Sequence, residues 1–507
     1  MTDIHKSLYK FMREYREKKG DEIALVYGSH KMNYNTLFKQ IDRVAGGLYR
    51  IGVRKGDVVM LALPNIMQCI VAVYACSRIG AIASMIHPKL SADEFESAVK
   101  KLKPKAVFLS DINVGSYYSR AKGIKKVLCP FLLYGYVGLP RGKFVPFEGD
   151  GEEIACYMQS GGTSGEPKTV AISSRCANAM AGNLLKHLGD KFAEHNAMLA
   201  VLPMFHGFGL CVGVHASIST NMRSVLQPVF DAQKTTKIIA KNHITTMIAV
   251  PRMVQKLLDC PLFHGENIAS IEDVYVGGDL VGEDLVQRFD ERMRECGGKG
   301  VLSPGYGLTE TASVCTVSRN DFVNGSVGKP ICEVTVRVVD DNLNEVPVGE
   351  VGELLVSGPQ TMSYYVDDKE GTSKALINLD GKKWVRTGDY FKLDDTGRLF
   401  FMGRKKRLIK ISGINVFPSE IERVAKELDF VNECCCVEYR VKGKPFIRLL
   451  IEGDISAEQK QIAVAHIAKR LSHWNKPSSV VCVKDFPRTR MSKIDVETLK
   501  AEYGTNE

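Results

Sequence analysis

The sequence predicts an α/β fold with a large N-terminal domain and a small C-terminal domain. Through most of the first 330 residues, helical patterns alternate with short apolar runs, such as AVFLS at 106–110 and TTMIAVP at 245–251. Such alternation is typical of layered helices and largely parallel sheets. From about residue 330 the pattern changes to strands and turns, as in residues 334–358, which predicts a β-rich subdomain of antiparallel hairpins.

A second change of pattern marks the predicted domain boundary. After RLFFMGRKKRLIKISG at residues 398–413, the pattern predicts helix, strand and helix within about a hundred residues, a usual length for a small α+β domain. We therefore place the boundary near Gly403–Lys406, with domains at 1–403 and 404–507.

Composition narrows the class of protein. With 507 residues, 45% hydrophobic and 25% charged, the chain is an ordinary globular protein. The 68 basic and 58 acidic residues give a net charge of +10, which favours anionic partners without naming one. The polar, charged first 20 residues lack the apolar core of a secretory signal, so we expect a cytoplasmic protein. The 14 cysteines form no CxxC pair, and the consecutive Cys434–Cys436 are expected to be small buried hydrophobes.

The longest apolar region, Val58–Ile86, could be mistaken for a membrane span. Pro64, Asn65, Gln68 and Arg78 interrupt it. We predict a parallel crossover unit here: a strand at 58–63, a helix capped by Asn65 that ends near Gly80, and a strand at 81–86. No membrane span is expected.

A segment rich in glycine and hydroxyl residues, YMQSGGTSGEPKTVAIS, occupies residues 157–173. It is not expected to be a Walker loop, because the residues after Lys168 have the pattern of a strand rather than a helix. We predict a hairpin whose tip could hold an anion, since glycines allow close approach and the hydroxyls and ammonium can bind it. Taken alone, the tip is equally compatible with a mobile surface loop. The candidate phosphate-binding residues are Ser160, Gly161, Gly162, Thr163, Ser164, Gly165 and Lys168.

Two further segments carry side chains suited to a nucleotide. In SPGYGLTET, residues 303–311, Tyr306 between glycines could lie flat on a purine, and Thr309 and Glu310 could reach a phosphate and its Mg²⁺. In WVRTGDY, residues 384–390, a strand is expected to end at Gly388-Asp389, where a carboxylate could accept both ribose hydroxyls. Each segment is also compatible with a plain turn.

Four other motifs are ambiguous by themselves. His206 in LPMFHGFGL follows a strand, where pockets open in α/β sheets, but it could also be a packed histidine; GGD at 277–279 could be a plain turn. The basic run in GRKKRLIKISG, 403–413, could bind nucleic acid, yet apolar residues interrupt it and no aromatic residues interleave, so a solvated basic edge is favoured. Lys493 in PRTRMSKID could be one more solvated lysine.

Together these motifs resemble the acyl-adenylating superfamily, which includes acyl-CoA synthetases, peptide-synthetase adenylation domains and luciferases. The segments SGGTSGEPK, LPMFHG, GYGLTE, RTGD, GRKKRLIKISGINVFPSEIE and the lysine of RMSKID occur in the family's order over almost the whole chain. The resemblance implies an ATP-dependent acid–thiol ligase. In such an enzyme a carboxylate attacks the α-phosphate of ATP, pyrophosphate leaves, and the acyl group then passes to a thiol.

The resemblance also implies a nucleotide site. The glycine-rich loop would hold the β- and γ-phosphates. By matched position, Tyr306 would stack on adenine, with Gly278 and Asp279 along its edge. Asp389 and Arg404 would hold the ribose.

The remaining matched positions imply metal binding and catalysis. Glu310 would bind Mg²⁺, and Lys493 would bridge the attacking carboxylate and the α-phosphate, where it stabilises developing charge. Lys406 falls at the family's hinge, about which the small, mobile C-terminal domain rotates between the two steps. That rotation would replace Lys493 by the segment containing Lys410, which serves the second step. We also expect His206 of LPMFHG to be a catalytic residue.

Four positions depart from the family's pattern. Thr169 stands where glycine is usual, Ser174 where histidine is usual, Pro304 where glutamine is frequent, and Ser492 where glycine usually precedes the lysine. These departures bear on substrate and fine positioning more than on the reaction class.

The expected acid has no α-ammonium group, because no acidic residue closely follows Phe205 to pair with one. An aryl or medium-chain acid is therefore expected. Gly207 and Gly209 could leave room for it, and Phe208 and Leu210 could supply apolar contact.

The expected acceptor is a free thiol. The sequence ends at Glu507, shortly after Lys493, so no fused carrier domain is expected. CoA is the first choice, and a stand-alone aryl-acid enzyme that loads a separate carrier protein's phosphopantetheine in nonribosomal peptide synthesis is the alternative. A nucleic-acid binder using residues 403–410, or an adenylate fold without catalysis, represents a different class; we expect no nucleic-acid partner.

Overall fold

The structure is a computed structural model that describes residues 3–130, 134–160, 168–188, 197–220, 222–319, 321–489 and 494–504. The candidate residues Gly161, Gly162, Thr163, Ser164, Gly165 and Lys493 lie outside these ranges.

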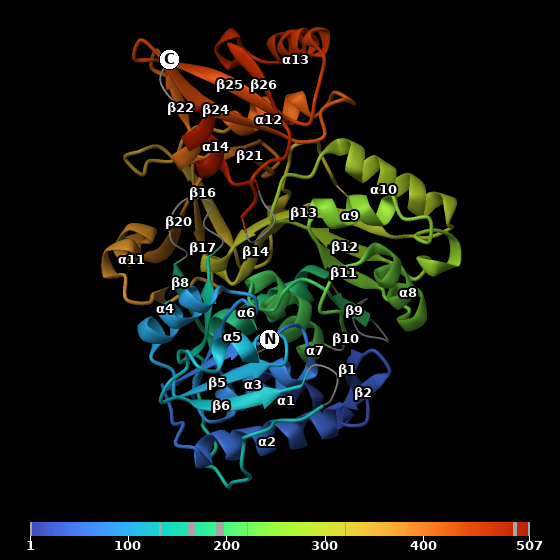
Figure 1. Cartoon of the computed structure of the whole chain (residues 1–507), viewed down its shortest axis with the longest axis vertical. Helices are drawn as coiled ribbons and strands as arrows, with labels where there is room; N and C mark the ends of the chain where they lie inside the picture. The colour runs from blue at the N-terminus through green and yellow to red at the C-terminus, as the bar shows by residue number, and fades with distance from the viewer. Residues whose placement is uncertain are drawn as a thin grey trace. The chain divides into compact units, whose positions relative to one another are not determined.

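A nine-stranded sheet carries several of the predicted strands (Figure 1). Six consecutive strands in the middle of the sheet are parallel, as predicted, while the outer two strands on one side and the outermost strand on the other pair antiparallel. In spatial order they are β15 (Lys329–Pro330), β14 (Ser313–Val317), β13 (Val301–Leu308), β12 (Asp273–Val276), β11 (Thr246–Ala249), β9 (Ala197–Ala200), β10 (Arg223–Leu226), β1 (Ile23–Tyr27) and β2 (His30–Asn33).

A seven-stranded sheet forms a second layer. Strands β4, β3, β5 and β6 are parallel, and β7 joins them parallel to β4 before the chain returns antiparallel in β8. The order is β18 (Tyr364–Tyr365), β8 (Thr169–Ser173), β7 (Ile154–Gln159), β4 (Ile82–Met85), β3 (Val58–Ala62), β5 (Ala106–Ser110) and β6 (Lys125–Cys129).

Helices cover these sheets. The described α-helices are α1 (Leu8–Arg16), α2 (Tyr34–Arg50), α3 (Met67–Arg78), α4 (Ala92–Leu102), α5 (Val114–Tyr117), α6 (Ser174–Leu188), α7 (Ser217–Ser219), α8 (Ala232–Asn242), α9 (Pro251–Leu258), α10 (Glu283–Glu295), α11 (Lys369–Ala375), α12 (Pro418–Ala425), α13 (Ala457–Arg470) and α14 (Val496–Tyr503). Shorter or irregular turns are η1 (Glu17–Lys19), η4 (Gly265–Asn267), η5 (Thr309–Thr311), η6 (Lys405–Arg407), η7 (His473–Asn475) and the π-helix η3 (Phe208–Ala216). The prediction of a layered α/β fold is confirmed.

The apolar region Val58–Ile86 is a buried crossover unit. Strands β3 and β4 are parallel, and α3 between them has buried side chains from Met67 through Ser77. Alternate residues of β3 face two hydrophobic clusters: Val59 and Leu61 belong to the largest one, Met60 to a second. The predicted helix cap is wrong, because Ile66 is the N-cap residue and makes no side-chain cap bond. None of the described helices is long and apolar enough to cross a membrane.

The β-rich region forms a five-stranded sheet. Its path is β16 (Thr335–Val339), β17 (Val351–Ser357), β20 (Lys382–Leu393) and β19 (Leu376–Leu379), with β21 (Leu399–Arg404) paired to β20. The predicted strand end at Gly388-Asp389 is wrong, because β20 continues to Leu393. Gly388 adopts φ +68° inside the strand, a conformation that favours glycine.

The C-terminal region contains more strands than the predicted helix, strand and helix. The hairpin of β22 (Ile409–Ile411) and β23 (Ile414–Val416) comes first. A three-stranded sheet of β24 (Cys434–Val441), β25 (Lys444–Glu452) and β26 (Ser479–Val483) follows. Cys434–Cys436 are buried on β24, as expected for small hydrophobes.

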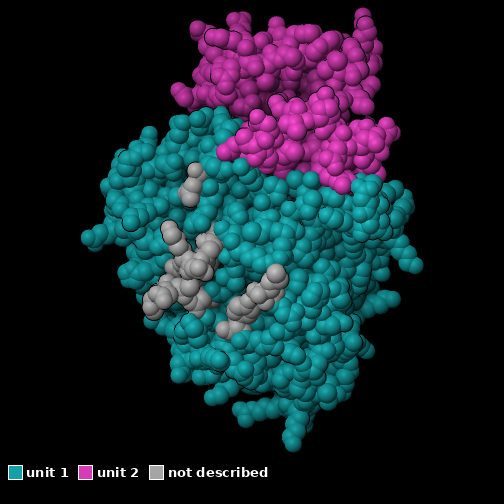
Figure 2. All heavy atoms as spheres, turned by 180° about the vertical axis from the view of Figure 1, so that it is seen from behind, with its two compact units in different colours: residues 1–160, 168–336, 356–385 teal, residues 161–167, 337–355, 386–507 magenta. Residues whose placement is uncertain are grey.

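The chain divides into two compact units, coloured separately in Figure 2. Unit 1 contains the described residues of 1–160, 168–336 and 356–385, and unit 2 contains those of 337–355 and 386–507. The boundary near residue 403 stays a prediction. The candidate site residues fall into both units, and each group is described separately below.

Candidate active site

The predicted hairpin of the glycine-rich segment is confirmed by its two strands. β7 and β8 pair antiparallel, with Gln159 opposite Thr169. At the base of the tip, the Ser160 N–H donates to the Lys168 carbonyl at 2.8 Å, and the Lys168 N–H donates to the Ser160 hydroxyl at 3.1 Å. The strand directly after Lys168 agrees with the prediction that this is not a Walker loop.

Lys168 and Glu310 come together around Tyr365, although they are far apart in the sequence. The Lys168 ammonium lies 4.3 Å from the centre of the Tyr365 ring and 3.2 Å from an Asp368 carboxylate oxygen. The Tyr365 hydroxyl donates to Glu310 Oε1 at 2.7 Å. Burial and the charge of Glu310 raise the pKa of Tyr365, so its hydroxyl keeps its proton. We call Lys168, Glu310, Tyr365 and Asp368 the Tyr365 cluster.

Tyr306 lies on β13, which pairs antiparallel with β14. Its glycine neighbours are explained by this pairing, because a Cβ atom added at Gly307 would lie 1.7 Å from the Ser313 carbonyl oxygen. One added at Gly305 would lie 2.7 Å from the Thr316 carbonyl oxygen. Glycines on both sides therefore let β14 approach, which leaves the half-buried Tyr306 at the end of the parallel part of the sheet.

Thr309 and Glu310 form the η5 turn that directly follows β13. Gly278 and Asp279 follow β12, the parallel neighbour of β13. Gly278 has φ +84°, and Asp279 is exposed. The candidate adenine residues are therefore brought to adjacent strand ends, as expected for the edge where ligands bind in α/β sheets.

His206 lies in the loop between β9 and η3, half-buried. Its ring packs edge-on against Phe205, with centroids 4.5 Å apart, and Phe205 in turn packs against His87. A Cβ atom at the next residue, Gly207, would lie 2.6 Å from the Ala312 carbonyl oxygen, so this loop approaches the η5 turn closely.

The expectation that Gly207 and Gly209 leave room for a substrate is wrong. A Cβ atom at Gly209 would lie 2.1 Å from the Pro203 carbonyl oxygen, so both glycines permit close backbone packing instead. Leu210 is buried in the core, whereas the Phe208 ring comes within 3.9 Å of where a Cβ atom at Gly277 would stand.

Asn65 positions the start of this loop. Its side-chain amide donates to the carbonyl oxygens of Ala200 and Leu202 at 3.2 and 2.8 Å, and its Oδ1 accepts the Met204 N–H at 3.0 Å. The residue that the sequence suggested as a helix cap therefore fixes the chain that leads to His206.

In unit 2, the structure brings the two candidate ribose residues together. Asp389 on β20 lies opposite Arg404 on β21, and their charged groups are 3.8 Å apart. The Asp389 side chain is 11% exposed and that of Arg404 39%. Thr387 supports the bend at Gly388, because its hydroxyl donates to the Leu354 carbonyl at 2.8 Å and accepts the Asp389 N–H at 3.1 Å.

The candidate hinge residue lies between two anchored neighbours. The Lys405 ammonium contacts Asp341 at 2.8 Å and Glu353 at 3.2 Å. Arg407 pairs with Glu422 and also donates to the Cys436 carbonyl. Lys406 between them is exposed.

Lys410 is exposed on β22, opposite Asn415 on β23. The turn between these strands has Ser412 at φ +50° and Gly413 at φ +84°. A two-residue turn with both φ angles positive matches the twist of a hairpin, so Lys410 stands on a locally well-formed ribbon.

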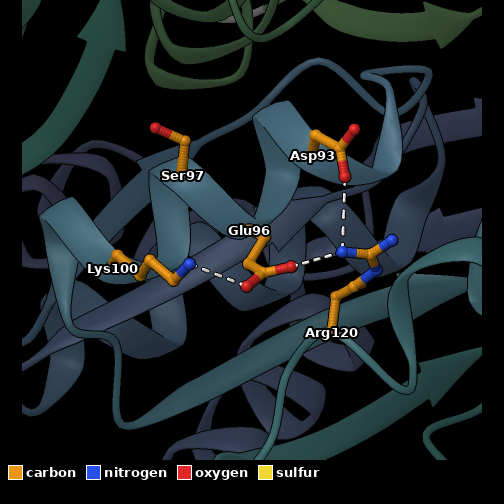
Figure 3. A pocket seen from close by; sticks show the side chains of 5 residues that line it. All are labelled: Asp93, Glu96, Ser97, Lys100 and Arg120. Atoms are coloured by element: carbon orange, nitrogen blue, oxygen red, sulfur yellow. Dashed lines mark hydrogen bonds and ion pairs between the residues drawn. The ribbon is translucent and has the colours of Figure 1, made fainter.

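A cluster of charges formed by α4 and by Arg120, which follows α5, is an internal ion-pair network rather than a ligand site (Figure 3). Glu96 accepts from Lys100 at 2.8 Å and from Arg120 at 2.5 Å, and Arg120 also approaches Asp93 at 3.3 Å. The hydrogen bonds from Lys100 and Arg120 lower the pKa of Glu96 to about 2. These charges are satisfied by one another.

No group of three or more His, Cys, Asp or Glu side chains converges as a metal site within the described ranges. Mg²⁺ usually keeps several waters and takes one or two carboxylates plus phosphate oxygens, so the single carboxylate of Glu310, held by Tyr365 on the same ring as Lys168, would suit that ion.

Comparisons with known proteins decide the family. The model of the family described as AMP-binding enzyme matches residues 12–366, more than half of the chain. The chain belongs to the AMP-binding enzyme family. This confirms the resemblance to acyl-adenylating enzymes and, at the level of enzyme class, the prediction of an AMP-forming acid–thiol ligase.

Relatives of this AMP-binding enzyme match nearly its whole length. Indoleacetate–CoA ligase of Aromatoleum aromaticum is 26% identical, covering 94% of this chain and 95% of that protein. Long-chain-fatty-acid–CoA ligase of Salmonella typhimurium is 27% identical, covering 99% and 95%. The structure of O-succinylbenzoate coenzyme A synthetase from Bacillus subtilis, in complex with ATP and magnesium ion, is similar with a TM-score of 0.83 and 25% identity, covering 98% of this chain and 99% of that one.

Sequence analysis missed Tyr365 and Asp368. Their only sequence signal is the run YYVDD at 364–368, an aromatic pair followed by acids without a periodic pattern. Their place in the candidate site depends on the pairing of β18 with β8, which puts Tyr365 opposite Val170 and next to Lys168.

Proposed function

We propose that this AMP-binding enzyme is an ATP-dependent carboxylic acid ligase that adenylates an aryl or medium-chain acid and transfers the acyl group to the thiol of CoA. The observation that carries the proposal is the Tyr365 cluster, which places an ammonium and a carboxylate around one aromatic ring at the base of the glycine-rich hairpin. Lys168 would contact the phosphates and Glu310 would hold Mg²⁺. When bound, the ion would neutralise phosphate charge and orient the leaving pyrophosphate.

In the proposed first half-reaction, the substrate carboxylate attacks the α-phosphorus and the bond to the β-phosphate oxygen breaks. Ser160, Gly161, Gly162, Thr163, Ser164, Gly165, Lys168 and Thr309 would hold the phosphates. Tyr306, Gly278 and Asp279 would hold adenine, and Asp389 with Arg404 the ribose. Lys493 would stabilise the charge that develops between carboxylate and phosphate.

In the proposed second half-reaction, the thiol attacks the acyl carbonyl carbon, AMP leaves, and a thioester forms. Lys410 would act at this stage after rotation about Lys406. The anchoring of Lys405 and Arg407 supports this hinge, because it leaves the exposed Lys406 as the residue between two held segments. Each turnover would convert the acid, ATP and the thiol into a thioester, AMP and pyrophosphate.

The proposed class of acid substrate is based on the loop that contains His206, between β9 and η3. Phe208 next to Gly277 offers an apolar ring surface, and the segment after Phe205 carries no acidic residue for an α-ammonium group. The related proteins named above act on acids as different as indoleacetate and long-chain fatty acids, so the acid must be found by experiment.

A panel of acids tests the proposal, scored by acid-dependent pyrophosphate release with CoA and, separately, with candidate carrier proteins. We expect release with one or more aryl or medium-chain acids and thioester formation with CoA. Thioester formation only with a carrier protein would establish the alternative, an aryl-acid enzyme of nonribosomal peptide synthesis. Binding of random duplex DNA with no pyrophosphate release from any acid would refute the ligase.

A matched pair of lysine variants tests the two half-reactions. Lys493→Ala should abolish acid-dependent pyrophosphate exchange yet still form thioester from supplied acyl-AMP. Lys410→Ala should show the opposite pattern. Equal loss of both activities in both variants would contradict the assignment of one lysine to each step.

A further inference from the structure

Tyr365 contacts both charged groups of the candidate phosphate site. The residue is only 8% exposed. The hydroxyl donates to Glu310 Oε1 at 2.7 Å, while the Lys168 ammonium lies over the face of the ring, 4.3 Å from its centre. A tyrosine ring attracts a cation through its electron-rich face and can still donate a hydrogen bond at its edge, so one side chain serves both partners.

The backbone around Tyr365 is tied to both partners as well. The Met362 N–H donates to the Glu310 carbonyl at 2.8 Å, and the Val366 N–H donates to the Thr169 carbonyl at 2.8 Å. Residues 362–366 therefore bridge the η5 turn and the strand that begins after Lys168. Movement of Tyr365 relative to either partner would break main-chain hydrogen bonds as well as side-chain contacts.

A second group holds Lys168 from another direction. Asp368 is the N-cap of α11 and accepts the Gly371 N–H at 2.7 Å, which fixes the carboxylate that pairs with Lys168. Gly371 leaves space for this arrangement, because a Cβ atom there would lie 2.6 Å from the Lys168 ammonium and 2.0 Å from Asp368 Oδ2.

We propose that Tyr365 is a positioning residue that holds the Glu310 carboxylate and the Lys168 ammonium at a fixed separation, matched to the Mg²⁺-bound phosphates of ATP. The inference rests on the proposed function and adds a residue to it. The tyrosine hydroxyl engages one oxygen of the Glu310 carboxylate and restrains that side chain, so the other oxygen would be available to hold the ion when the nucleotide binds. Preorganised charges of this kind cost no rearrangement when the ligand binds.

The variant Tyr365→Phe separates the two contacts, because it keeps the ring under Lys168 and removes only the hydroxyl. Binding is measured by calorimetry with ATP in excess Mg²⁺ and with ATP in EDTA. We expect affinity for Mg·ATP to fall about tenfold, the worth of a hydrogen bond to a charged group, while affinity for metal-free ATP changes by less than about twofold. The Mg²⁺ concentration for half-maximal pyrophosphate exchange should rise in parallel, with the KM for the acid unchanged.

Two further variants sharpen the experiment. Tyr364→Phe removes a hydroxyl from the neighbouring residue of the same short strand, which is 38% exposed, and should leave the affinities for Mg·ATP and metal-free ATP and the Mg²⁺ dependence at wild-type values. Gly371→Ala should displace the flexible ends of Lys168 and Asp368. The affinity for metal-free ATP should therefore fall as much as the affinity for Mg·ATP, by about threefold. The effect is small because a partly exposed ion pair contributes little to binding.

The outcomes are distinct. Wild-type Mg²⁺ dependence in Tyr365→Phe would overturn the inference. So would a lower Tm together with a higher acid KM and no change in Mg²⁺ dependence, because that pattern indicates a purely structural tyrosine. If the wild-type protein neither binds Mg·ATP nor exchanges pyrophosphate with any acid, the proposed function itself is refuted, and this inference with it.

Discussion

Unit 1 contains two polar clusters built around tyrosines, and they differ in what they leave available. In the Tyr365 cluster, Lys168 and Asp368 have side chains 44% and 37% exposed. In the second cluster, Tyr74, His215 and Asn178 are all at most 1% exposed. The Tyr74 hydroxyl lies 2.8 Å from His215 Nδ1, and His215 Nε2 lies 3.1 Å from Asn178 Oδ1.

The buried cluster satisfies its members completely and stays neutral. The Asn178 amide donates to the carbonyl oxygens of Ile4 and Lys6, so its Oδ1 must accept from His215 Nε2–H, and His215 Nδ1 accepts from Tyr74. Burial lowers the pKa of His215 to about 3 and raises that of Tyr74. The cluster therefore ties the N-terminal segment to α3, α6 and η3.

The Tyr365 cluster instead keeps charges near solvent. An ammonium has three N–H donors and a carboxylate several lone pairs, and the contacts described for Lys168 and Glu310 use only part of this capacity. The comparison teaches that a saturated, neutral network serves the fold, whereas a network that positions partly exposed charges can serve a ligand.

The largest expected effect is on catalysis. Glu310→Gln keeps the shape of the side chain and an acceptor for Tyr365, but removes the negative charge that would bind Mg²⁺. Acid-dependent pyrophosphate release should fall about 100-fold or more, comparable with the loss of other groups that stabilise developing charge. The Tm should stay near that of wild type. Near-normal turnover would remove Glu310 from the metal site and reduce the cluster to a structural one.

The next effect is on stability. Asn178→Ala leaves the buried His215 N–H without its acceptor and releases two backbone carbonyls. We expect the free energy of unfolding to fall by about 3 kcal/mol. Chemical denaturation measures this change, and turnover per folded molecule should be retained. A loss of turnover without loss of stability would show that this cluster also supports the reaction.

A smaller effect is expected from pH. The unfolded chain protonates His215 near its ordinary pKa of about 6.5, whereas the folded protein does not do so until about pH 3. Unfolding therefore takes up a proton in this window, so stability is lost as pH falls below about 6.5, by at most about 1.4 kcal/mol per pH unit from this group. His215→Gln should flatten the dependence of Tm on pH between 6.5 and 5, even if its Tm is lower throughout. An unchanged slope would contradict the assignment.

The smallest effect is expected at Asp368. Asp368→Asn keeps an N-cap acceptor for α11 but removes the charge that pairs with Lys168. No measurable change in Tm is expected, because the pair is partly exposed, while affinity for ATP should weaken by about threefold. A marked drop in Tm with unchanged ATP affinity would assign Asp368 to the fold rather than to the site.

Several features could be predicted from the sequence because they depend on local patterns. The alternation of strands and helices predicted the layered α/β class. The apolar runs on both sides of the glycine-rich segment predicted the β7–β8 hairpin. The order of the motifs along the chain identified the family. Each motif can be recognised from its own residues, without knowing how the strands pair.

Other features depended on contacts that no local pattern records. Glycines at 207 and 209 were expected to leave room, but the structure uses them for close backbone packing. Gly388-Asp389 was expected to end a strand, yet a positive φ at Gly388 lets β20 continue and brings Asp389 opposite Arg404. Asn65 was expected to cap a helix, but it holds the backbone of Ala200–Met204.

The sequence by itself determined the class of the fold, the family and which residue types could bind a nucleotide, because periodicity and motif chemistry are local properties of the chain. The tertiary structure alone decided that Tyr365 would join Lys168 to Glu310. The pairing of β18 with β8 joins residues almost 200 positions apart in the chain. Such a pairing is selected by the burial and hydrogen bonding of the whole sheet rather than by any short segment.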